Sequence, residues 1–411
     1  MKKIERANVE KIKKNIGADL NEYIAMVIPI IESVKKDGDR AIYRYAELFK
    51  DPIPESLKIE NKKNVSIPKE VKKALYKASE NIRKYHERQL PKEWSFSVSP
   101  GICSGEIVRP LERVGCYVPG GKYPLVSSVL MTAIPAKVAG VEEIIVCTPK
   151  PTPEILFACE LAGVQSIFQA GGAQAIAAMA YGTESIPKVQ KIVGPGNHFV
   201  SAAKKLVYGD VDIDFIAGPS EVVIIGDENA NPEYIAADML AQAEHDENAR
   251  SIFLTPSNSL ARQVREKIIK QLKTLPTADI AKKSLDKNGN IFIVKDLKEA
   301  FEISNYLAPE HLELHLNDIS WLEKVKNAGA VFLGEYSVEA AGDYASGPSH
   351  VLPTNGMATR SSGLSVRDFI KMPSFQKLNK EGLKSIGETI KILARIEGLE
   401  GHARSVEIRG I

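Results

Sequence analysis

Two side chains in one helical segment could hold a metal ion. Gln242 and His245 lie in AADMLAQAEHDE, after Asn231-Pro232, and a spacing of three residues puts both on one helix face. Asp238 lies four residues before Gln242 and shares that face, so it is a candidate third ligand or a residue that orients the ligands. Glutamine is an uncommon zinc ligand because its amide oxygen is neutral. The spacing therefore permits a metal site without requiring one.

A carboxylate and an imidazole are adjacent in APEHLELH, as Glu310 and His311. A neutral imidazole accepts protons near neutral pH, and burial can raise the pKa of a carboxyl group toward the same range. The two residues, at the mouth of a candidate strand, are therefore a candidate pair of proton acceptors. His315 lies on the same strand face as His311 by parity, where packing is its ordinary role.

Two other segments each combine a carboxylate with an imidazole. Asp343 and His350 flank GDYASGPSH, a glycine-, serine- and proline-rich stretch that is typical of a loop and could bring both to one site. Glu397 and His402 lie in IEGLEGHAR, where glycines break a helix; such tails are usually frayed ends, yet this one holds one of only seven histidines. The residues alone thus indicate a possible metal centre made of Gln242, His245 and some of Asp238, Asp343, His350 and His402. A metal-dependent hydrolase would fit them as well as an oxidoreductase would.

The elements that must position these residues form two α/β series. Short apolar runs alternate with alanine-rich helical stretches, which indicates βαβ units and parallel sheets. The first series has predicted strands at 114–118, 143–147, 164–168, 191–193 and 212–216. The second has predicted strands at 222–226, 251–255, 291–294, 312–316 and 330–334. Two consecutive five-strand units are the simplest interpretation.

The segments outside these series have other patterns. Residues 8–90 are predicted to be mostly helical, with a helix beginning at Pro68-Lys69-Glu70. Residues 94–110 favour a β-hairpin or two short strands, and a helical tail is expected from about Ser374 to Ile411.

Glycine-rich turns follow several predicted strands, as PGG (119–121), GGAQA (171–175), GPGN (194–197) and AGPSE (217–221). Ligands of open α/β sheets bind at the carboxyl ends of the strands, and GPGN before a predicted helix could hold a phosphate or cofactor. Tight connections also need glycine, so a purely structural role stays open. Neither the dinucleotide fingerprint G-x-G-x-x-G nor the P-loop motif occurs.

Composition limits the class of protein. The chain has 411 residues, 44% of them hydrophobic and 26% charged, which favours a soluble globular protein of two to three domains. Its 54 basic residues nearly balance 52 acidic ones, which argues against a nucleic-acid-binding protein. No secretory signal and no apolar run of the ~18 residues needed for a membrane helix occur, so we expect a cytoplasmic protein with no membrane partner. The four cysteines are scattered and are expected to be buried thiols.

Several motifs taken together resemble histidinol dehydrogenase. They occur in that family's order between Gly115 and His402, and HERQLP near residue 86 extends the match: VPGGKYP, GGAQAIAAMAYGTES, KIVGPGN, DFIAGPSEVVIIGD, LAQAEHD, APEHLEL, AGDYASGPSHVLPT and EGLEGHARS. One departure lies in GGKYPLVSSVLM, where the Tyr-Pro pair sits nearer the glycines than in many members. The path of the 119–130 loop is therefore left open.

The resemblance implies an activity: a zinc-dependent enzyme that oxidises L-histidinol to L-histidine through histidinaldehyde, with two NAD, at the end of histidine biosynthesis. It also implies an α/β fold of two Rossmann-like parallel-sheet units that lack the usual glycine fingerprint, with helical N-terminal and C-terminal extensions. The expected divisions are an extension with a short hairpin (1–110), a cofactor-side unit (111–219), a metal and catalytic unit (220–345) and a dimer-completing tail (346–411).

The resemblance also implies roles for individual residues. Catalysis falls on Glu310 and His311, and the zinc ligands fall on Gln242, His245, Asp343 and His402, which favours Asp343 over Asp238. Substrate contacts fall on Ser220, His350 and Glu397, as well as on His311 and the metal ligands. Cofactor contacts fall on Tyr117, Gln174 and Asn197. A homodimer is implied, in which the tail residues Glu397 and His402 complete the partner's site.

Two rival classes stay open beside this one. A zinc-dependent amidohydrolase would use the same metal ligands without a nicotinamide, and a non-catalytic binding protein would use a cleft between the units without turnover. Reduction of NAD by histidinol would distinguish the dehydrogenase from both.

Overall fold

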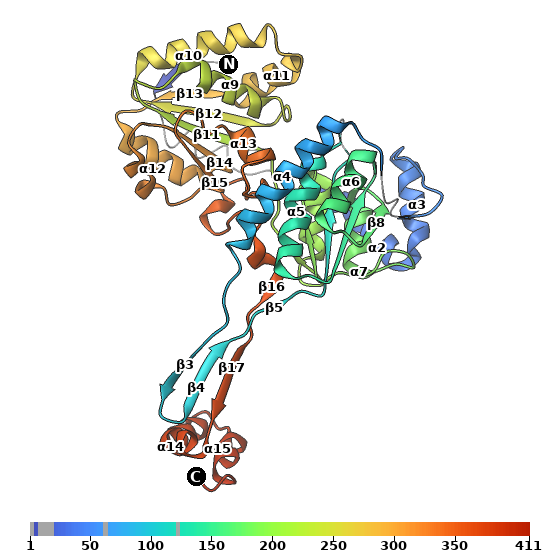
Figure 1. Cartoon of the computed structure of the whole chain (residues 1–411), viewed down its shortest axis with the longest axis vertical. Coiled ribbons are helices and arrows are strands. Elements are labelled where there is room, and N and C mark those ends of the chain that lie inside the picture. Colours follow the sequence, from blue (N-terminus) through green and yellow to red (C-terminus); the bar gives the residue numbers. More distant parts are fainter. Residues whose placement is uncertain (1–3, 7–19, 61–64, 121–123) are drawn as a thin grey trace.

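The computed structural model describes residues 4–6, 20–60, 65–120 and 124–411, and it contains two sheet-based units and a long arm (Figure 1). Both units contain a parallel sheet covered by helices, so the predicted α/β class with two parallel-sheet units is confirmed. Residues 121–123 of the 119–130 loop lie outside the described residues. None of the described helices combines the length and apolar character needed to cross a membrane.

The first unit is built on a sheet of strand order β10-β9-β6-β7-β8-β2, parallel except at β2. Its strands are β6 (Arg113–Tyr117), β7 (Glu143–Thr148), β8 (Ser166–Gln169), β9 (Lys191–Val193), β10 (Asp212–Ile213) and β2 (Lys58–Ile59). The central strands are apolar at successive positions because both faces are covered: in β7, Ile144 and Val146 pack on one side, and Ile145 and Cys147 on the other.

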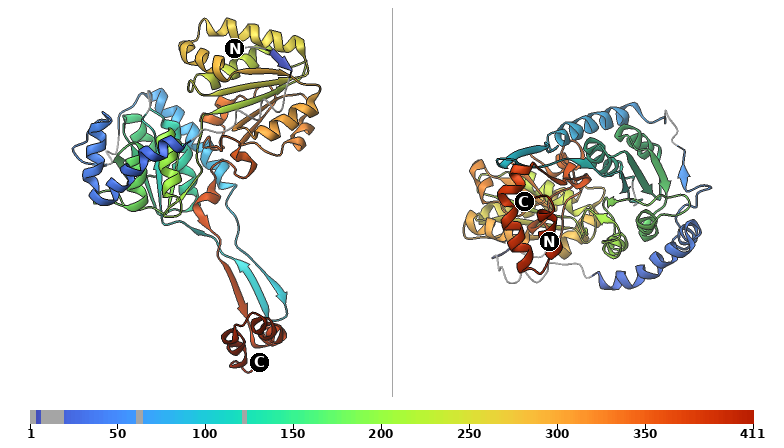
Figure 2. Two further views of the ribbon diagram at one scale, coloured as in Figure 1. Left: turned by 180° about the vertical axis from the view of Figure 1, so that it is seen from behind. Right: turned by 90° about the horizontal axis from the view of Figure 1, so that it is seen from below.

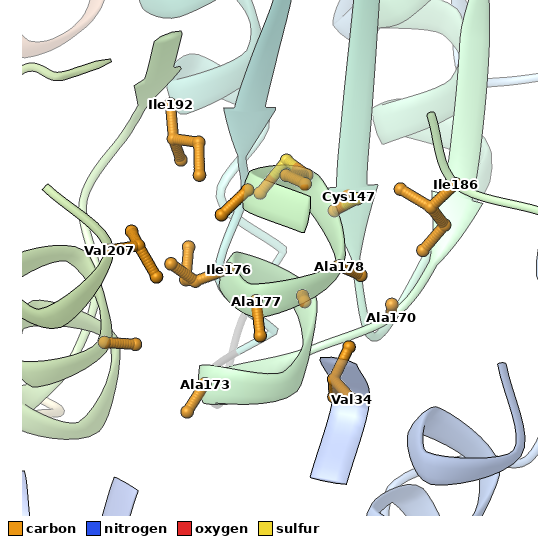
Figure 3. Close-up of a cluster of buried hydrophobic side chains, with 14 of the residues drawn as sticks. Val34, Cys147, Ala170, Ala173, Ile176, Ala177, Ala178, Ile186, Ile192 and Val207 are labelled. Atoms are coloured by element: carbon orange, nitrogen blue, oxygen red, sulfur yellow. The ribbon is translucent and has the colours of Figure 1, made fainter. Parts of the chain in front are cut away.

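Helices complete the first unit on both faces of its sheet. One face is covered by α4 (Lys69–Glu87), α5 (Val126–Ala139) and α6 (Pro153–Ala162). The other is covered by α2 (Asn21–Asp37), α3 (Asp39–Leu48), α7 (Gly172–Tyr181) and α8 (His198–Val207). Figure 3 shows the small side chains of α7, such as Ala173 and Ala177, within this second core, where Val34 of α2 also packs. Alanine allows the helix to lie close to the sheet edge where a cofactor is expected.

The second unit is a fully parallel sheet of order β1-β13-β12-β11-β14-β15. Its strands are β1 (Ile4–Arg6), β13 (Asn290–Ile293), β12 (Arg250–Thr255), β11 (Glu221–Gly226), β14 (His311–His315) and β15 (Ala330–Leu333). One face is covered by α9 (Pro232–Ala243), α10 (Asn258–Leu272) and α11 (Ala278–Asn288), and the other by α12 (Leu297–Leu307). A short helix, α13 (Glu339–Tyr344), follows β15.

The structure contains a strand at each of the ten predicted positions of the two series. It also contains two short strands near the N-terminus that were not predicted: β1 precedes residues 8–90, which were expected to be mostly helical, and β2 lies within them. β1 pairs with β13 of the second sheet, and β2 pairs with β8 of the first. Runs of two or three residues carry no detectable periodicity, and their pairing is decided by distant sheet edges. The helix expected from Pro68 is present as α4.

The arm carries the C-terminus away from both sheets (Figures 1 and 2). It consists of β3 (Trp94–Ser99), β4 (Ile102–Glu106) and β17 (Ser374–Leu378), with the helices α14 (Lys380–Ile396) and α15 (Glu400–Glu407) at its tip. A two-stranded sheet of β5 (Arg109–Pro110) and β16 (Ile370–Lys371) lies at its base. The expected helical start near Ser374 is wrong: Ser374–Leu378 is a strand, because it pairs with the open edge of β4.

Candidate active site

Three elements of the second unit converge near the start of β14. Alternate residues of a strand share a face, so His311, Glu313 and His315 of β14 point together, while Leu312 and Leu314 pack in the core on the α12 side. Helix α9 contributes Asp238 and Gln242, and α13 contributes Glu339 and Asp343, each pair one turn apart. His245 follows the end of α9.

Asp343 lies between two imidazoles. Its Oδ2 is 3.8 Å from Nε2 of His245, and its Oδ1 is 3.8 Å from Nε2 of His311. Ligand atoms of His245, Glu339 and Asp343 all lie within 4.8 Å of one another, which is close enough for one ion to contact all three. Gln242 adjoins this group, since its amide is in hydrogen-bonding contact with Glu339. We call His245, Gln242, Glu339 and Asp343 the metal group.

His311 is held in the tautomer that suits a base. Its Nδ1 lies 3.2 Å from the carbonyl oxygen of Glu221, and because a carbonyl oxygen only accepts, Nδ1 carries the hydrogen. Nε2 is buried and has no hydrogen-bond partner within the described residues, so its lone pair is free. Burial lowers the pKa of His311 to about 4, which keeps the imidazole neutral.

Glu310 is fixed by Glu221 of β11, the residue that also holds His311. Its Oε2 accepts a hydrogen bond of 2.9 Å from the backbone N–H of Glu221 and lies 3.7 Å from Nδ1 of His311. Both contacts follow from the parallel pairing of β11 with β14, in which Val222 lies opposite His311. Burial raises the pKa of Glu310 well above its ordinary value.

A cavity of about 740 Å³ opens beside these residues. His311, Asp343 and His350 line it together with Gln89, which follows α4 of the first unit, so the cavity lies between the two units. His350 donates from Nδ1 to the carbonyl oxygen of Asp343 at 2.9 Å. The volume is adequate for a small polar substrate together with part of a cofactor.

The charges of the site favour a bound cation. Glu221 pairs with Arg250, while His315 lies 3.4 Å from Glu313 and 3.5 Å from Asp238. Burial alone would lower the pKa of His315, but its contacts with these two carboxylates raise the pKa to about 9. Among the residues that the structure describes, no lysine or arginine forms an ion pair with Glu310, Glu339 or Asp343. Buried carboxylates beside an imidazole are a donor set that suits zinc, so the residues fit a metal ion.

The three proposed cofactor contacts lie at the carboxyl edge of the first sheet. Tyr117 ends β6, and its hydroxyl oxygen accepts from the N–H of Gly172 at 3.0 Å. Gln174 is buried in the first turn of α7, and its Oε1 has no partner among the described residues. Asn197 caps α8, accepting from the N–H groups of Phe199 and Val200. The described residues that line the large cavity include none of the three.

Comparisons with known proteins identify the family of this chain. The family model for histidinol dehydrogenase matches residues 13–410. A histidinol dehydrogenase of Aquifex aeolicus is 50% identical over 395 residues, covering 94% of this chain and 92% of the relative. One of Methanothermobacter thermautotrophicus is 46% identical over 411 residues, covering 98% and 96%. The crystal structure of histidinol dehydrogenase from Elizabethkingia anophelis superposes with a TM-score of 0.92 at 37% identity, covering 98% of this chain and 96% of that one.

The chain belongs to the histidinol dehydrogenase family. The resemblance seen in the sequence motifs is thereby confirmed, and the protein is an oxidoreductase of the dehydrogenase class. The four cysteines are free thiols, as expected, and all but the half-buried Cys103 are buried.

Two of the residues that the histidinol dehydrogenase motifs single out lie apart from the others. Glu397 ends α14 and His402 lies in α15, both exposed at the tip of the arm (Figure 2). Within one chain, the structure brings together Gln242, His245, Glu310, His311, Asp343 and His350, with Ser220 directly before Glu221. Glu397 and His402 are not among them.

Sequence reasoning missed Glu339 and Glu221. Glu339 precedes Asp343 by one helical turn, and that spacing would have been the signal for it. Glu221 holds Glu310 and His311 through its backbone groups, and such contacts have no signature in the sequence. Asp238 pairs with His315 and Glu313 in a separate buried group rather than with His245.

Proposed function

We propose that the protein is a zinc-dependent dehydrogenase that oxidises L-histidinol to L-histidine through histidinaldehyde, with two NAD, as the last step of histidine biosynthesis. Family membership supports this proposal. The observation that carries it is the imidazole of His311, which is neutral, has a free Nε2 and borders the cavity beside Asp343. A base in that position can take a proton from an alcohol.

Three members of the metal group are the proposed zinc ligands within one chain. Gln242, His245 and Asp343 of one subunit, with His402 of the partner subunit, would hold the ion. Zinc, when bound, would orient the substrate through its imidazole and amine nitrogens and polarise the reacting oxygen. Ser220, His350 and the partner's Glu397 are proposed to contact the rest of the substrate.

His311 accepts the hydroxyl proton at Nε2 in the first oxidation. Tyr117, Gln174 and Asn197 would hold NAD, which would supply the hydride acceptor for each of the two oxidations. The aldehyde carbon then requires a water molecule. Glu310 is suited to activate it, since its Oε2 is held by the N–H of Glu221 while Oε1 is left to accept a proton. His311 serves again as the base in the second oxidation.

No cysteine is assigned to the reaction. Burial raises the pKa of the Cys116 thiol to about 12, and it raises the pKa values of Cys147 and Cys159 as well. Cys103 lies in β4, on the arm. The aldehyde is therefore taken to react as its hydrate rather than through a thiohemiacetal.

A homodimer would bring the tail residues to the partner's site. The tip of the arm exposes apolar side chains, among them Ile396 at 77% and Ile408 at 85%, which favours its burial against another subunit. If the tail crosses between subunits, mixing an inactive His311→Asn variant with an inactive His402→Asn variant should restore activity through hybrid dimers. Absence of recovery, once subunit exchange has been verified, would contradict the shared site.

The direct test of the reaction is cofactor stoichiometry. Purified zinc-loaded protein is incubated with limiting L-histidinol and excess NAD, and reduced nicotinamide is followed by its absorbance. We expect two reduced cofactors per substrate. One reduced cofactor would limit the activity to alcohol oxidation, and none would refute the assignment.

A further inference from the structure

Glu339 is a buried carboxylate that none of the proposed roles uses. It is the first residue of α13, 2% exposed, and its Oε1 lies 3.6 Å from Nδ1 of His311. Its carboxylate belongs to the metal group, with ligand atoms close to those of His245 and Asp343. It is therefore placed either to bind the ion itself or to act on a neighbour that does.

A direct contact between Glu339 and Gln242, with no ion between the two side chains, is satisfied in only one orientation of the amide. A carboxylate accepts hydrogen bonds, so the amide oxygen of Gln242 cannot face it, whereas the amide nitrogen can donate to both of its oxygens. With the nitrogen so placed, the two donor–acceptor distances are 2.5 and 3.0 Å. Gln242 is fully buried, so no bulk water competes for the amide. The oxygen of Gln242 is consequently turned away from Glu339.

We propose that Glu339 is the positioning residue that makes Gln242 a metal ligand. An amide can present either end to a cation, but only its oxygen can bind one. By accepting from the nitrogen, Glu339 fixes the end that faces the metal, as outer carboxylates fix other metal ligands. This inference rests on the proposed zinc function.

The second buried group supports Glu339. Oε1 of Glu313 accepts from the backbone N–H of Glu339 at 2.9 Å, while Oε2 of Glu313 lies 3.4 Å from Nε2 of His315. Oδ2 of Asp238 lies 3.5 Å from the same nitrogen of His315. Glu313 therefore holds the start of α13, and with it the carboxylate of Glu339, while His315 lies between Glu313 and Asp238.

A double-mutant cycle on zinc affinity tests the inference, with affinity measured by competition with a chromophoric chelator rather than by activity. Glu339→Gln should weaken zinc binding about 10- to 100-fold. Gln242→Ala should weaken it comparably, and adding Glu339→Gln to Gln242→Ala should cost little more, because Glu339 would act only through the amide. Glu335→Gln, which removes an exposed carboxylate before the same helix, should leave zinc affinity unchanged.

Three results would overturn the proposal. Unchanged zinc affinity in Glu339→Gln would refute it, and fully additive losses in the cycle would make Glu339 a direct ligand instead. A parent protein that binds no zinc would refute the zinc function and this inference together. If the parent binds zinc and Glu339→Gln binds it equally well, only this inference fails. Should Glu339→Gln not fold by circular dichroism, Glu339→Asp keeps the charge but shortens the reach. It should weaken zinc binding in the same direction, and parent-like affinity would refute the proposal.

Discussion

The carboxyl edge of the first sheet and the amino edge of the second sheet carry charge in different ways. In the first unit, Nζ of Lys204 lies 2.6 Å from Oδ1 of Asp214, and both side chains are buried. Oδ2 of Asp214 accepts from the N–H of Gly194, so the pair also holds the GPGN turn. In the second unit, Glu310, Glu339 and Asp343 lie together with no lysine or arginine ion pair among the described residues. The first edge is balanced within the chain, whereas the second is not.

This difference separates the roles of the two units. A balanced ion pair makes a fixed support, which suits the repeated binding and release of a cofactor. Unbalanced carboxylates beside a free imidazole nitrogen are costly without a cation, and the proposed metal ion would offset that cost. Chemistry is therefore expected at the second edge and cofactor binding at the first. Substitutions at the second edge should therefore lower the rate of the reaction, whereas substitutions at the first edge should affect stability or the KM for NAD.

The largest effect is expected from His311→Asn, which removes the base at the second edge. Its kcat should fall by about 10²- to 10⁴-fold, the usual contribution of a general base, with zinc content unchanged by elemental analysis. His198→Asn, at the first edge, should alter kcat by less than about tenfold, since that ring packs tilted against Tyr23, with ring centroids 4.9 Å apart. Similar losses in both variants would erase the distinction between the edges.

Glu310→Gln should separate the two oxidations. Water activation is needed only for the aldehyde step, so aldehyde oxidation should fall by about 10²-fold or more beyond any loss in aldehyde reduction to the alcohol. The two directions are compared in steady-state assays with histidinaldehyde as substrate. Equal loss in both directions would contradict the assignment of Glu310 to water activation.

Lys204→Met tests the balanced edge. It leaves the carboxylate of Asp214 buried at 1% exposure without its cation, which should cost about 3–5 kcal/mol of unfolding free energy. Urea unfolding measures the loss, which added zinc should not recover. Combining it with Asp214→Asn, which removes the stranded charge, should regain part of the stability. A loss below about 1 kcal/mol would show that this pair is not what holds the first edge.

The smallest effect is expected from Gln174→Ala. Losing one hydrogen-bonding group to the cofactor should raise the KM for NAD by roughly tenfold while leaving kcat and zinc affinity close to those of the parent. Initial rates at varied NAD provide the measurement. A lowered kcat with unchanged KM would place Gln174 outside the cofactor site.

Ten strands of the two units could be predicted from sequence, because each lies in a short run rich in apolar residues between turns. The helical spacing of Gln242 and His245 and the adjacency of Glu310 and His311 are also local, so the residues themselves drew attention to them. β1, β2 and β17 could not be found this way, since each is defined by pairing with a distant strand.

The features of the site that could not be predicted depend on contacts between elements that are distant in sequence. Glu221 holds Glu310 through its backbone N–H and His311 through its carbonyl oxygen, which any side chain at that position could leave in place. Glu339 gains its role only where α13 meets α9, and these helices are separated by most of the second unit in sequence. The scarcity of histidines in the chain drew attention to His402. No local sequence pattern, however, indicates that the arm holds His402 away from the site of its own subunit.

The most direct measurement is anomalous diffraction at the zinc absorption edge from crystals of the zinc-loaded protein. We expect one peak per subunit, beside His245, Asp343 and the amide oxygen of Gln242, with His402 of the partner subunit adjoining it. No peak is expected among Asp238, Glu313 and His315. A peak in that buried group, or none at the metal group, would contradict the view that the second edge is completed by a metal ion.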